Sequence, residues 1–320
     1  MALLEVEHLK KYFPVQRGLT RKTVGYYKAV DDVSFSIESG ETFGLVGESG
    51  CGKTTVGKSV LRLTEPTDGV VRLDGREITT MSAVELREQR KNMQIIFQDP
   101  YSSLNPRMTV ETLIAEPMFE HKLISGKAEA REQVAEILNK VGLNPKDMHK
   151  YPHEFSGGQR QRVMIARAIS VHPRLVVCDE PVSALDVSVQ AQILNLMQDL
   201  QDELGISYLF IAHGMPVVQH ISNRVGVMYL GHLVEVAEST ELFLHHLHPY
   251  TKALLAAIPN PDPDQPNDFD FVRGEVPNLM DPPPGCLFSN RCPYCTQRCK
   301  EEMPQLREVS PCHQVACHCV

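Results

Sequence analysis

This sequence of 320 residues has no long hydrophobic run, no excess of basic residues and no internal repeat. Its apolar runs fall far short of the roughly 20 residues that a helix needs to cross a bilayer, so we expect no membrane-spanning helix. The formal net charge is −8, which does not suggest a basic face of the kind that nucleic-acid binding requires. Residues Met1 to Glu7 lack a basic segment followed by an apolar core, and we therefore expect no secretory signal.

The composition is that of a globular protein. Hydrophobic residues make up 42% of the chain, which suffices for packed cores. The length favours about two domains.

The segment from Gly47 to Thr55 fits the phosphate-loop pattern G-x-x-x-x-G-K-[ST]. The apolar run Thr42 to Val46 precedes it, and apolar residues at helical spacing follow up to Leu63, so strand, loop and helix come in the order that this motif needs. In such a loop, backbone N–H groups surround the β-phosphate, Lys53 reaches the β and γ oxygens, and Thr54 ligates Mg²⁺. The predicted nucleotide contacts here are Gly47, Ser49, Gly50, Cys51, Gly52, Lys53, Thr54 and Thr55. The sequence therefore predicts a nucleoside triphosphate site.

Two carboxylates follow a second apolar run, which begins at Leu175. Such a run predicts a buried strand that delivers Asp179 and Glu180 at its exposed end. We expect Asp179 to hold Mg²⁺ through water and Glu180 to polarise the attacking water.

The sequence Ser156-Gly157-Gly158-Gln159 lies about twenty residues before that strand end and opens a predicted helix that runs to about Ser170. Ser156 is placed as an N-cap, and the two glycines leave backbone donors open to a phosphate. Taken alone such a segment is a common turn, and its value comes from its place before the acidic strand end.

Together, and in this order, these motifs resemble those of the ATP-binding subunits of ABC transporters, from about Leu4 to Ser239. The resemblance implies that Tyr12 stacks on adenine, that Gln98 senses Mg²⁺ and the γ-phosphate, and that His213 contacts the γ-phosphate. It makes Glu180, His213 and Gln98 the catalytic residues, and Thr54, Gln98 and Asp179 the residues around Mg²⁺.

The same resemblance implies a nucleotide site that is shared between two subunits. Residues Ser156 to Gln159 correspond to the signature sequence, which in this family completes the site of the opposite subunit, and Asp186 corresponds to a dimer contact. The chain departs from the family at Gly214, because an acidic residue usually follows the switch histidine.

Seven of the nine cysteines lie between Cys286 and Cys319. They follow proline-rich stretches at 259–264 and 281–284, which predict a linker. Because no secretory signal is expected, disulfides are disfavoured and a metal or a cluster is favoured.

The order of Cys286, Cys292, Cys299 and Cys317 resembles the C-terminal extension of oligopeptide and dipeptide importer ATPases, as does His248-Pro249-Tyr250-Thr251 at its start. The resemblance implies that these four cysteines hold a 4Fe-4S cluster. Two alternatives stay open. Cys292 and Cys295 form a C-x-x-C pair that suits zinc, and the thiols could also be free and reduced.

We therefore expect an α/β protein with a RecA-like phosphate-loop ATPase core, an antiparallel β subdomain, a helical subdomain near residues 100–155 and a small cysteine-rich C-terminal domain. The expected boundaries are 1–240 for the ATP-binding domain and 241–320 for the C-terminal extension with an iron–sulfur site.

The expected function is ATP hydrolysis that powers the import of dipeptides or oligopeptides, with ATP and Mg²⁺ as ligands. The resemblance implies a second, related ATPase subunit, two transmembrane permease subunits and an extracytoplasmic peptide-binding protein as partners, at the cytoplasmic face of the inner membrane. The alternative is a soluble cassette ATPase that acts on ribosomes or DNA. A third interpretation, an electron carrier, is disfavoured by the complete set of ATPase motifs.

Overall fold

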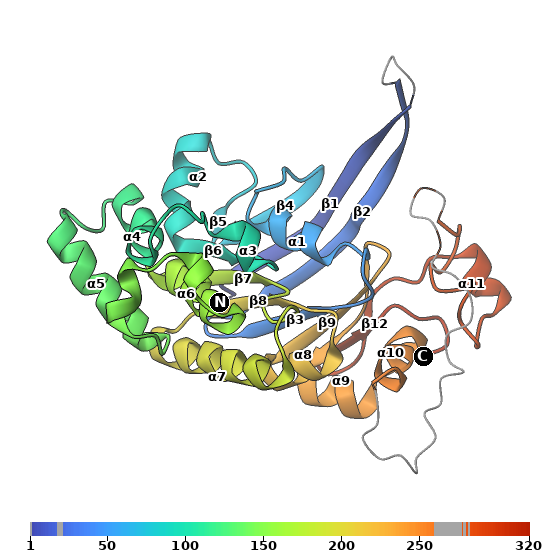
Figure 1. The fold of residues 1–320 in the computed structure, drawn as a ribbon. Helices are drawn as coiled ribbons and strands as arrows, with labels where there is room; N and C mark the ends of the chain where they lie inside the picture. The colour runs from blue at the N-terminus through green and yellow to red at the C-terminus, as the bar shows by residue number, and fades with distance from the viewer. Residues whose placement is uncertain (1, 18–21, 259–276, 278–279, 281) are drawn as a thin grey trace, which may run out of the picture. The chain divides into compact units, whose positions relative to one another are not determined.

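The computed structural model describes residues 2–17, 22–258, 277, 280 and 282–320 (Figure 1). The chain forms two compact units, the first from residues 37–42 and 80–211 with Ala2, the second from residues 3–36, 43–79 and 212–320. Among the described residues, no helix combines the length and the hydropathy that a membrane span requires. The proline-rich stretch 259–264 and Asp281 lie outside the described residues.

The first unit contains a buried parallel sheet. Strand β7 (Leu175–Asp179) pairs on one side with β6 (Met93–Ile96) and on the other with β8 (Ser207–Ile211). All five residues of β7 and of β8 are buried, as expected for parallel strands covered on both faces. The carboxyl ends of these strands face the same edge of the sheet, where α/β folds place ligand-binding groups.

Helices make up the rest of the first unit. They are α2 (Ala83–Gln89), α3 (Pro100–Ser103), α4 (Val110–Glu120), α5 (Lys127–Lys140), α6 (Gly157–Ile169) and α7 (Val187–Leu204), with 3-10 turns at Arg90–Asn92, Pro145–His149 and Pro152–Glu154. A break separates α4 from α5. Lys122, at φ +56°, adopts a left-handed turn between them, and Gly126 caps the second helix.

The second unit carries an antiparallel sheet in the order β2-β1-β4-β5. Its strands are β1 (Leu4–Arg17), β2 (Lys22–Ile37), β4 (Asp68–Leu73) and β5 (Arg76–Glu77), and β1 and β2 form the long ribbon seen in Figure 1. Asp74 and Gly75 both have positive φ at the turn after β4.

A second set of strands in this unit runs in the order β3-β9-β10-β12-β11. Strand β3 (Thr42–Val46) pairs in parallel with β9 (Arg224–Tyr229), which continues antiparallel into β10 (His232–Glu238). The helices of the unit are α1 (Lys53–Val60), α8 (Met215–Ile221), α9 (Ser239–His245), α10 (Pro249–Ala256) and α11 (Gln297–Glu301).

The C-terminal region, which we define as residues 282–320, joins this sheet directly. Its hairpin of β11 (Arg307–Ser310) and β12 (His313–Val315) pairs through β12 with β10. The buried His313 Nε2 lies 2.8 Å from Glu235 Oε1, and both side chains are fully buried. The Glu235 carboxylate also accepts hydrogen bonds from the N–H groups of Leu247 and His248. The region is thus held by pairing and buried polar contacts.

Candidate nucleotide site

The phosphate loop connects β3 to α1 in a conformation that two glycines allow. Gly47 has φ +151° and Gly52 has φ +108°, which side-chain-bearing residues rarely adopt. A Cβ atom on Gly47 would lie 2.1 Å from the carbonyl oxygen of Met228, and one on Gly52 would lie 2.0 Å from that of Ala29. Only glycine therefore fits at either position.

Lys53 begins α1 and is buried, with 4% of its surface exposed. Its ammonium donates to the carbonyl oxygens of Gly47, at 2.7 Å, and Glu48, at 3.0 Å, so the charge lies inside the loop. No side chain caps this helix and no acidic residue lies in its first turn. Its N-terminal N–H groups and Lys53 together suit a phosphate, since both carry positive charge toward the loop. The loop therefore has the positively charged groups that binding of the ATP phosphates requires.

Tyr12 lies in β1 of the second unit and donates a hydrogen bond to Asp31. Burial and this bond raise the pKa of the Tyr12 hydroxyl, so the ring stays uncharged. The ammonium of Lys28 lies 5.2 Å from the ring centroid, within the range of a cation–π contact. Stacking of Tyr12 on adenine stays a prediction.

Glu180 and Gln98 meet in the first unit. Gln98 Nε2 donates to Glu180 Oε2 at 2.8 Å, although the two residues are 82 positions apart. Asp179 is the last residue of β7 and is buried. Glu180 follows it with φ +50°, an uncommon value for a side-chain-bearing residue that turns the chain sharply at the strand end. The sequence places both carboxylates at this end, but carries no signal for that backbone conformation.

The signature segment forms the start of α6, as predicted. Ser156 Oγ accepts from the N–H of Gln159, and the Gln159 side chain accepts from the N–H of Ser156, so the N-cap is confirmed as a capping box. A Cβ atom on Gly158 would lie 2.6 Å from a Val189 methyl group, whereas one on Gly157 would meet Leu185 at 3.5 Å. Gly158 thus permits close packing, while Gly157 is half-buried and has room for a Cβ atom.

Two further predicted residues occupy helix starts. Asp186 caps α7 by accepting from the N–H of Val189 at 2.9 Å. His213 is exposed in the second unit, directly before α8. Gly214 has φ −89°, an ordinary value, so the departure from the family pattern requires no special backbone conformation there.

The predicted site residues divide between the two units. The phosphate loop, Tyr12 and His213 belong to the second unit, whereas Gln98, Ser156, Asp179 and Glu180 belong to the first. Their roles toward ATP and Mg²⁺ remain predictions.

The structure does not bear out the predicted 4Fe-4S site. Within the described residues, which include Cys286, Cys292, Cys299 and Cys317, no group of three or more His, Cys, Asp or Glu side chains is arranged to hold a metal ion. The prediction of a cluster is therefore wrong, and its zinc alternative gains no support.

The physical reason lies in the premise behind that prediction. We expected a metal or a cluster among these crowded cysteines, but the C-terminal region is held by β12 pairing with β10 and by Phe288, which is 1% exposed. Burial also raises the pKa of the Cys286 thiol to about 12 and that of Cys292 to about 11.

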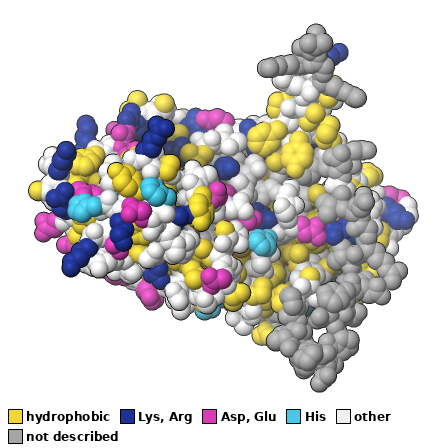
Figure 2. All heavy atoms as spheres, in the orientation of Figure 1, with side chains coloured by type: hydrophobic (Ala, Val, Ile, Leu, Met, Phe, Trp, Pro, Cys, Tyr) yellow, Lys and Arg dark blue, Asp and Glu magenta, His cyan; other side chains and the backbone are white. Residues whose placement is uncertain are grey.

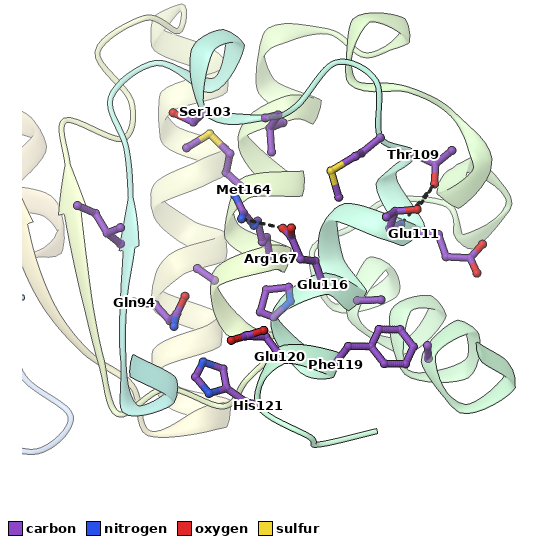
Figure 3. Close-up of a pocket in the computed structure, with 18 of the residues that line it drawn as sticks. Gln94, Ser103, Thr109, Glu111, Glu116, Phe119, Glu120, His121, Met164 and Arg167 are labelled. Atoms are coloured by element: carbon purple, nitrogen blue, oxygen red, sulfur yellow. Dashed lines mark hydrogen bonds and ion pairs between the residues drawn. The ribbon is translucent and has the colours of Figure 1, made fainter. Parts of the chain in front are cut away.

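A groove of about 1120 Å³ lies within the first unit (Figure 3). It is lined by apolar groups, among them Met164 and Phe119, and by charged ones, and Arg167 donates to Glu116 at 3.1 Å across it. In Figure 2, the region where Figure 1 draws α4 and α5 mixes hydrophobic, basic and acidic side chains. The sequence analysis did not find this groove, because its lining is assembled from residues as distant as Gln94 and Ala168.

Comparisons with known proteins match both parts of the chain. A family model described as ABC transporter matches residues 30–183. A second model, described as the C-terminal region of oligopeptide/dipeptide transporters, matches residues 234–299.

Curated relatives match along nearly the whole chain. The oligopeptide transport ATP-binding protein AppF of Bacillus subtilis is 50% identical over 319 residues, covering 99% of this chain and 97% of its own. A putative peptide import ATP-binding protein of Brucella ovis is 50% identical over 315 residues, covering 98% of this chain and 97% of its own.

Solved structures show the same fold. The cbiO1 subunit of an ABC transporter complex from Clostridium perfringens has a TM-score of 0.65 at 25% identity, covering 76% of this chain and 91% of its own. A dimeric ATP-binding cassette bound to ADP and phosphate in a post-hydrolysis state has a TM-score of 0.65 at 26% identity, covering 74% of this chain and 98% of its own. The chain is thus similar to ABC ATPases in both sequence and fold.

Proposed function

This chain belongs to the family of ATP-binding subunits of oligopeptide and dipeptide ABC transporters, and we propose that it hydrolyses ATP to drive peptide import through Gln98, Glu180 and the phosphate loop. The observation that carries this assignment is the 2.8 Å hydrogen bond from Gln98 to Glu180 at the end of β7. It joins the carboxylate placed to orient the attacking water to the residue that leads into α3 and α4.

Glu180 acts as the general base in this proposal. Its backbone is left-handed, at φ +50°, and the amide of Gln98 donates to one of its carboxylate oxygens. The switch histidine, His213, contacts the γ-phosphate.

The loop supplies binding. The N–H groups at the start of α1 and the ammonium of Lys53 hold the phosphates, and Tyr12 stacks on the base. Thr54, Asp179 and Gln98 would hold Mg²⁺, which when bound neutralises charge on the phosphates. Oxygen ligands of this kind suit Mg²⁺.

Two subunits share each site in this proposal. Ser156, Gly157, Gly158 and Gln159 serve the nucleotide of the opposite subunit, with Asp186 beside the contact. The room beside Gly157 supports this role, because a phosphate must approach those N–H groups closely. The partner is a second, related ATPase subunit, so that the pair is a heterodimer.

The groove beside α4 serves the permeases. Its volume of about 1120 Å³ exceeds the range of typical small-molecule pockets, about 300–1,000 Å³, and suits a helical segment with mixed polar and apolar groups. Two permease subunits and an extracytoplasmic peptide-binding protein complete the importer, and the chain lies at the cytoplasmic face of the inner membrane.

The finer architecture follows the same family. We assign a RecA-like core, an antiparallel β subdomain and a helical subdomain near residues 100–155 to an ATP-binding domain at 1–240. Residues 241–320 form the C-terminal extension. The alternative function, a soluble cassette ATPase acting on ribosomes or DNA, is not supported by the relatives, which are peptide transport proteins by name.

Glu180→Gln tests the proposal. The amide keeps the size of the side chain but removes the base, so ATP turnover should fall by about 10²–10⁴-fold while ATP still binds. The measurement is steady-state hydrolysis in the reconstituted transporter, with equilibrium ATP binding alongside. Glu88→Gln, an exposed glutamate of the same unit, is the matched control. Near-normal turnover in Glu180→Gln would overturn the assignment.

A further inference from the structure

The C-terminal region contacts the phosphate loop through Arg291. The Arg291 guanidinium donates from Nη1 to Glu48 Oε2 and from Nη2 to Glu48 Oε1, both at 3.0 Å. Glu48 is the residue directly after Gly47, so this two-pronged ion pair ends on the loop itself. The Arg291 side chain is only 7% exposed and that of Glu48 is 29% exposed, so solvent screens the pair weakly.

A second contact holds the same loop residue by its backbone. The N–H of Glu48 donates to the hydroxyl of Tyr250, the second residue of α10, at 2.8 Å. Tyr250 is fully buried against Tyr229 and Phe288. The loop is therefore fixed at Glu48 by two residues that lie more than 200 positions further along the chain.

Packing fixes the guanidinium in place. The N–H of Arg291 donates to the carbonyl of Phe288 at 2.9 Å in a turn, and its Nη1 donates to the Tyr229 hydroxyl at 3.3 Å. The guanidinium carbon lies 5.8 Å from the Tyr229 ring centroid and 5.7 Å from that of Phe288. An arginine is suited to such a place because its planar fork binds a carboxylate and packs on aromatic faces at once.

The charges of Arg291 and Glu48 bear on the binding of a triphosphate. A carboxylate on a loop that receives a triphosphate repels it, because like charges at short range in a weakly screened site oppose one another. The fork of Arg291 neutralises that carboxylate and holds both of its oxygens. Burial alone would lower the pKa of Arg291, but its bonds to Glu48 and Tyr229 raise it, so the guanidinium keeps its charge at every working pH.

We propose that Arg291 is a positioning residue for ATP binding, which neutralises Glu48 and fixes the phosphate loop from the C-terminal region. The proposal rests on ATP binding by this loop, as argued above. It gives the C-terminal region a role in nucleotide affinity that its cysteines do not explain.

The test measures the equilibrium Kd of the full-length chain for MgATP and MgADP with Arg291→Met and with Glu48→Gln/Arg291→Met. Arg291→Met leaves Glu48 unpaired, and the Kd for ATP should rise about 10- to 100-fold. The rise should be smaller for ADP, which carries less charge. In the double variant no carboxylate remains, and the Kd should return to within about threefold of the wild-type value.

Arg298→Met is the matched control, because Arg298 pairs with Glu302 inside the C-terminal region, at 2.8 Å, and not with the loop. Its Kd for ATP should stay unchanged. Should Arg291→Met fail to fold, Arg291→Lys keeps the charge but loses the fork, and a rise of a few-fold is expected.

Three outcomes would overturn the proposal. They are a wild-type Kd in folded Arg291→Met or Arg291→Lys, a double variant that binds no better than Arg291→Met, and equal losses for ATP and ADP. The last two indicate a purely structural role. Lys53→Ala separates this failure from that of the proposed function, because it should abolish ATP binding wherever the loop is the site. Wild-type protein that binds no ATP would refute both proposals.

Discussion

The phosphate loop and the C-terminal region belong to the same unit, but their structures depend on different ranges of sequence. The backbone conformation of the loop depends on glycines within it, since Gly47 and Gly52 adopt φ values that other residues avoid, although Tyr250 and Arg291 also hold it at Glu48. The C-terminal region is held by partners far along the chain, with β12 on β10 and Phe288 on Tyr229. A motif whose cause is local can be interpreted from sequence, whereas a region held by distant contacts cannot.

The largest effect should come from breaking the loop. Gly52→Ala places a Cβ atom 2.0 Å from the carbonyl oxygen of Ala29, a backbone atom that cannot move aside, at a φ of +108°. ATP affinity should fall by about 1,000-fold or more, equivalent to about 4 kcal/mol. Titration with a fluorescent nucleotide measures it.

Gly50→Ala is the control for that change. Gly50 also has positive φ, +81°, but a Cβ atom there would meet nothing within 4 Å. Strain alone should cost about 1–2 kcal/mol. Equal losses in both variants would mean that backbone conformation, and not the close approach, governs the loop.

The next largest effect is expected on the stability of the C-terminal region. Phe288 is 1% exposed and packs on Tyr229, Tyr250 and His248. Phe288→Ala should lower the free energy of unfolding by about 3–5 kcal/mol, because it removes a large buried ring. Urea unfolding measures the loss. Tyr294→Ala, at an aromatic that is 49% exposed in the same region, should change it by less than about 0.5 kcal/mol, and a similar loss there would contradict the comparison.

The third effect depends on pH. Burial lowers the pKa of His248 from 6.5 to about 4, although a backbone bond near Ala316 opposes the shift. The unfolded chain therefore binds this proton more readily, so stability is complete above pH 6.5 and falls as pH drops toward 4. The loss from this residue should be about 3 kcal/mol, since each pKa unit is worth about 1.4 kcal/mol.

His248→Asn isolates that loss. Asparagine keeps an acceptor for the N–H of Tyr250 at the start of α10 but does not titrate in this range. The difference in unfolding free energy between pH 7 and pH 4 should shrink by about the same 3 kcal/mol. An unchanged pH profile would show that folding does not lower the pKa of His248.

The smallest effect is expected at a helix cap, whose cause is local in the sequence. Ser82 caps α2 in a capping box with Glu85, with N–H to carboxylate at 2.8 Å. Ser82→Ala should cost about 1 kcal/mol in unfolding free energy, as exposed caps do. Val84→Ala, at an exposed residue of the same helix, should be neutral or slightly stabilising, because alanine is the better helix former.

The strands and helix caps around the site followed from sequence, because their causes are close by. The apolar run at Leu175–Asp179 is a buried strand, and Ser156 is an N-cap, as predicted. The groove beside α4 and the pairing of Glu48 with Arg291, 243 residues apart, carry no local pattern at all. The prediction of a cluster was wrong because it was carried over from a family resemblance in the order of four cysteines, which does not establish how their thiols lie in this chain.

At Glu180, the residue proposed for hydrolysis is not the one that would give the highest thermal stability. Its left-handed backbone, at φ +50°, is a conformation that glycine would adopt freely and glutamate adopts at a cost of about 1–2 kcal/mol. Replacement by glycine should therefore raise the melting temperature while removing the base. A protein engineer who selects for heat resistance alone would be drawn toward that inactive variant, so screens for sturdier versions of this subunit need to score hydrolysis together with stability.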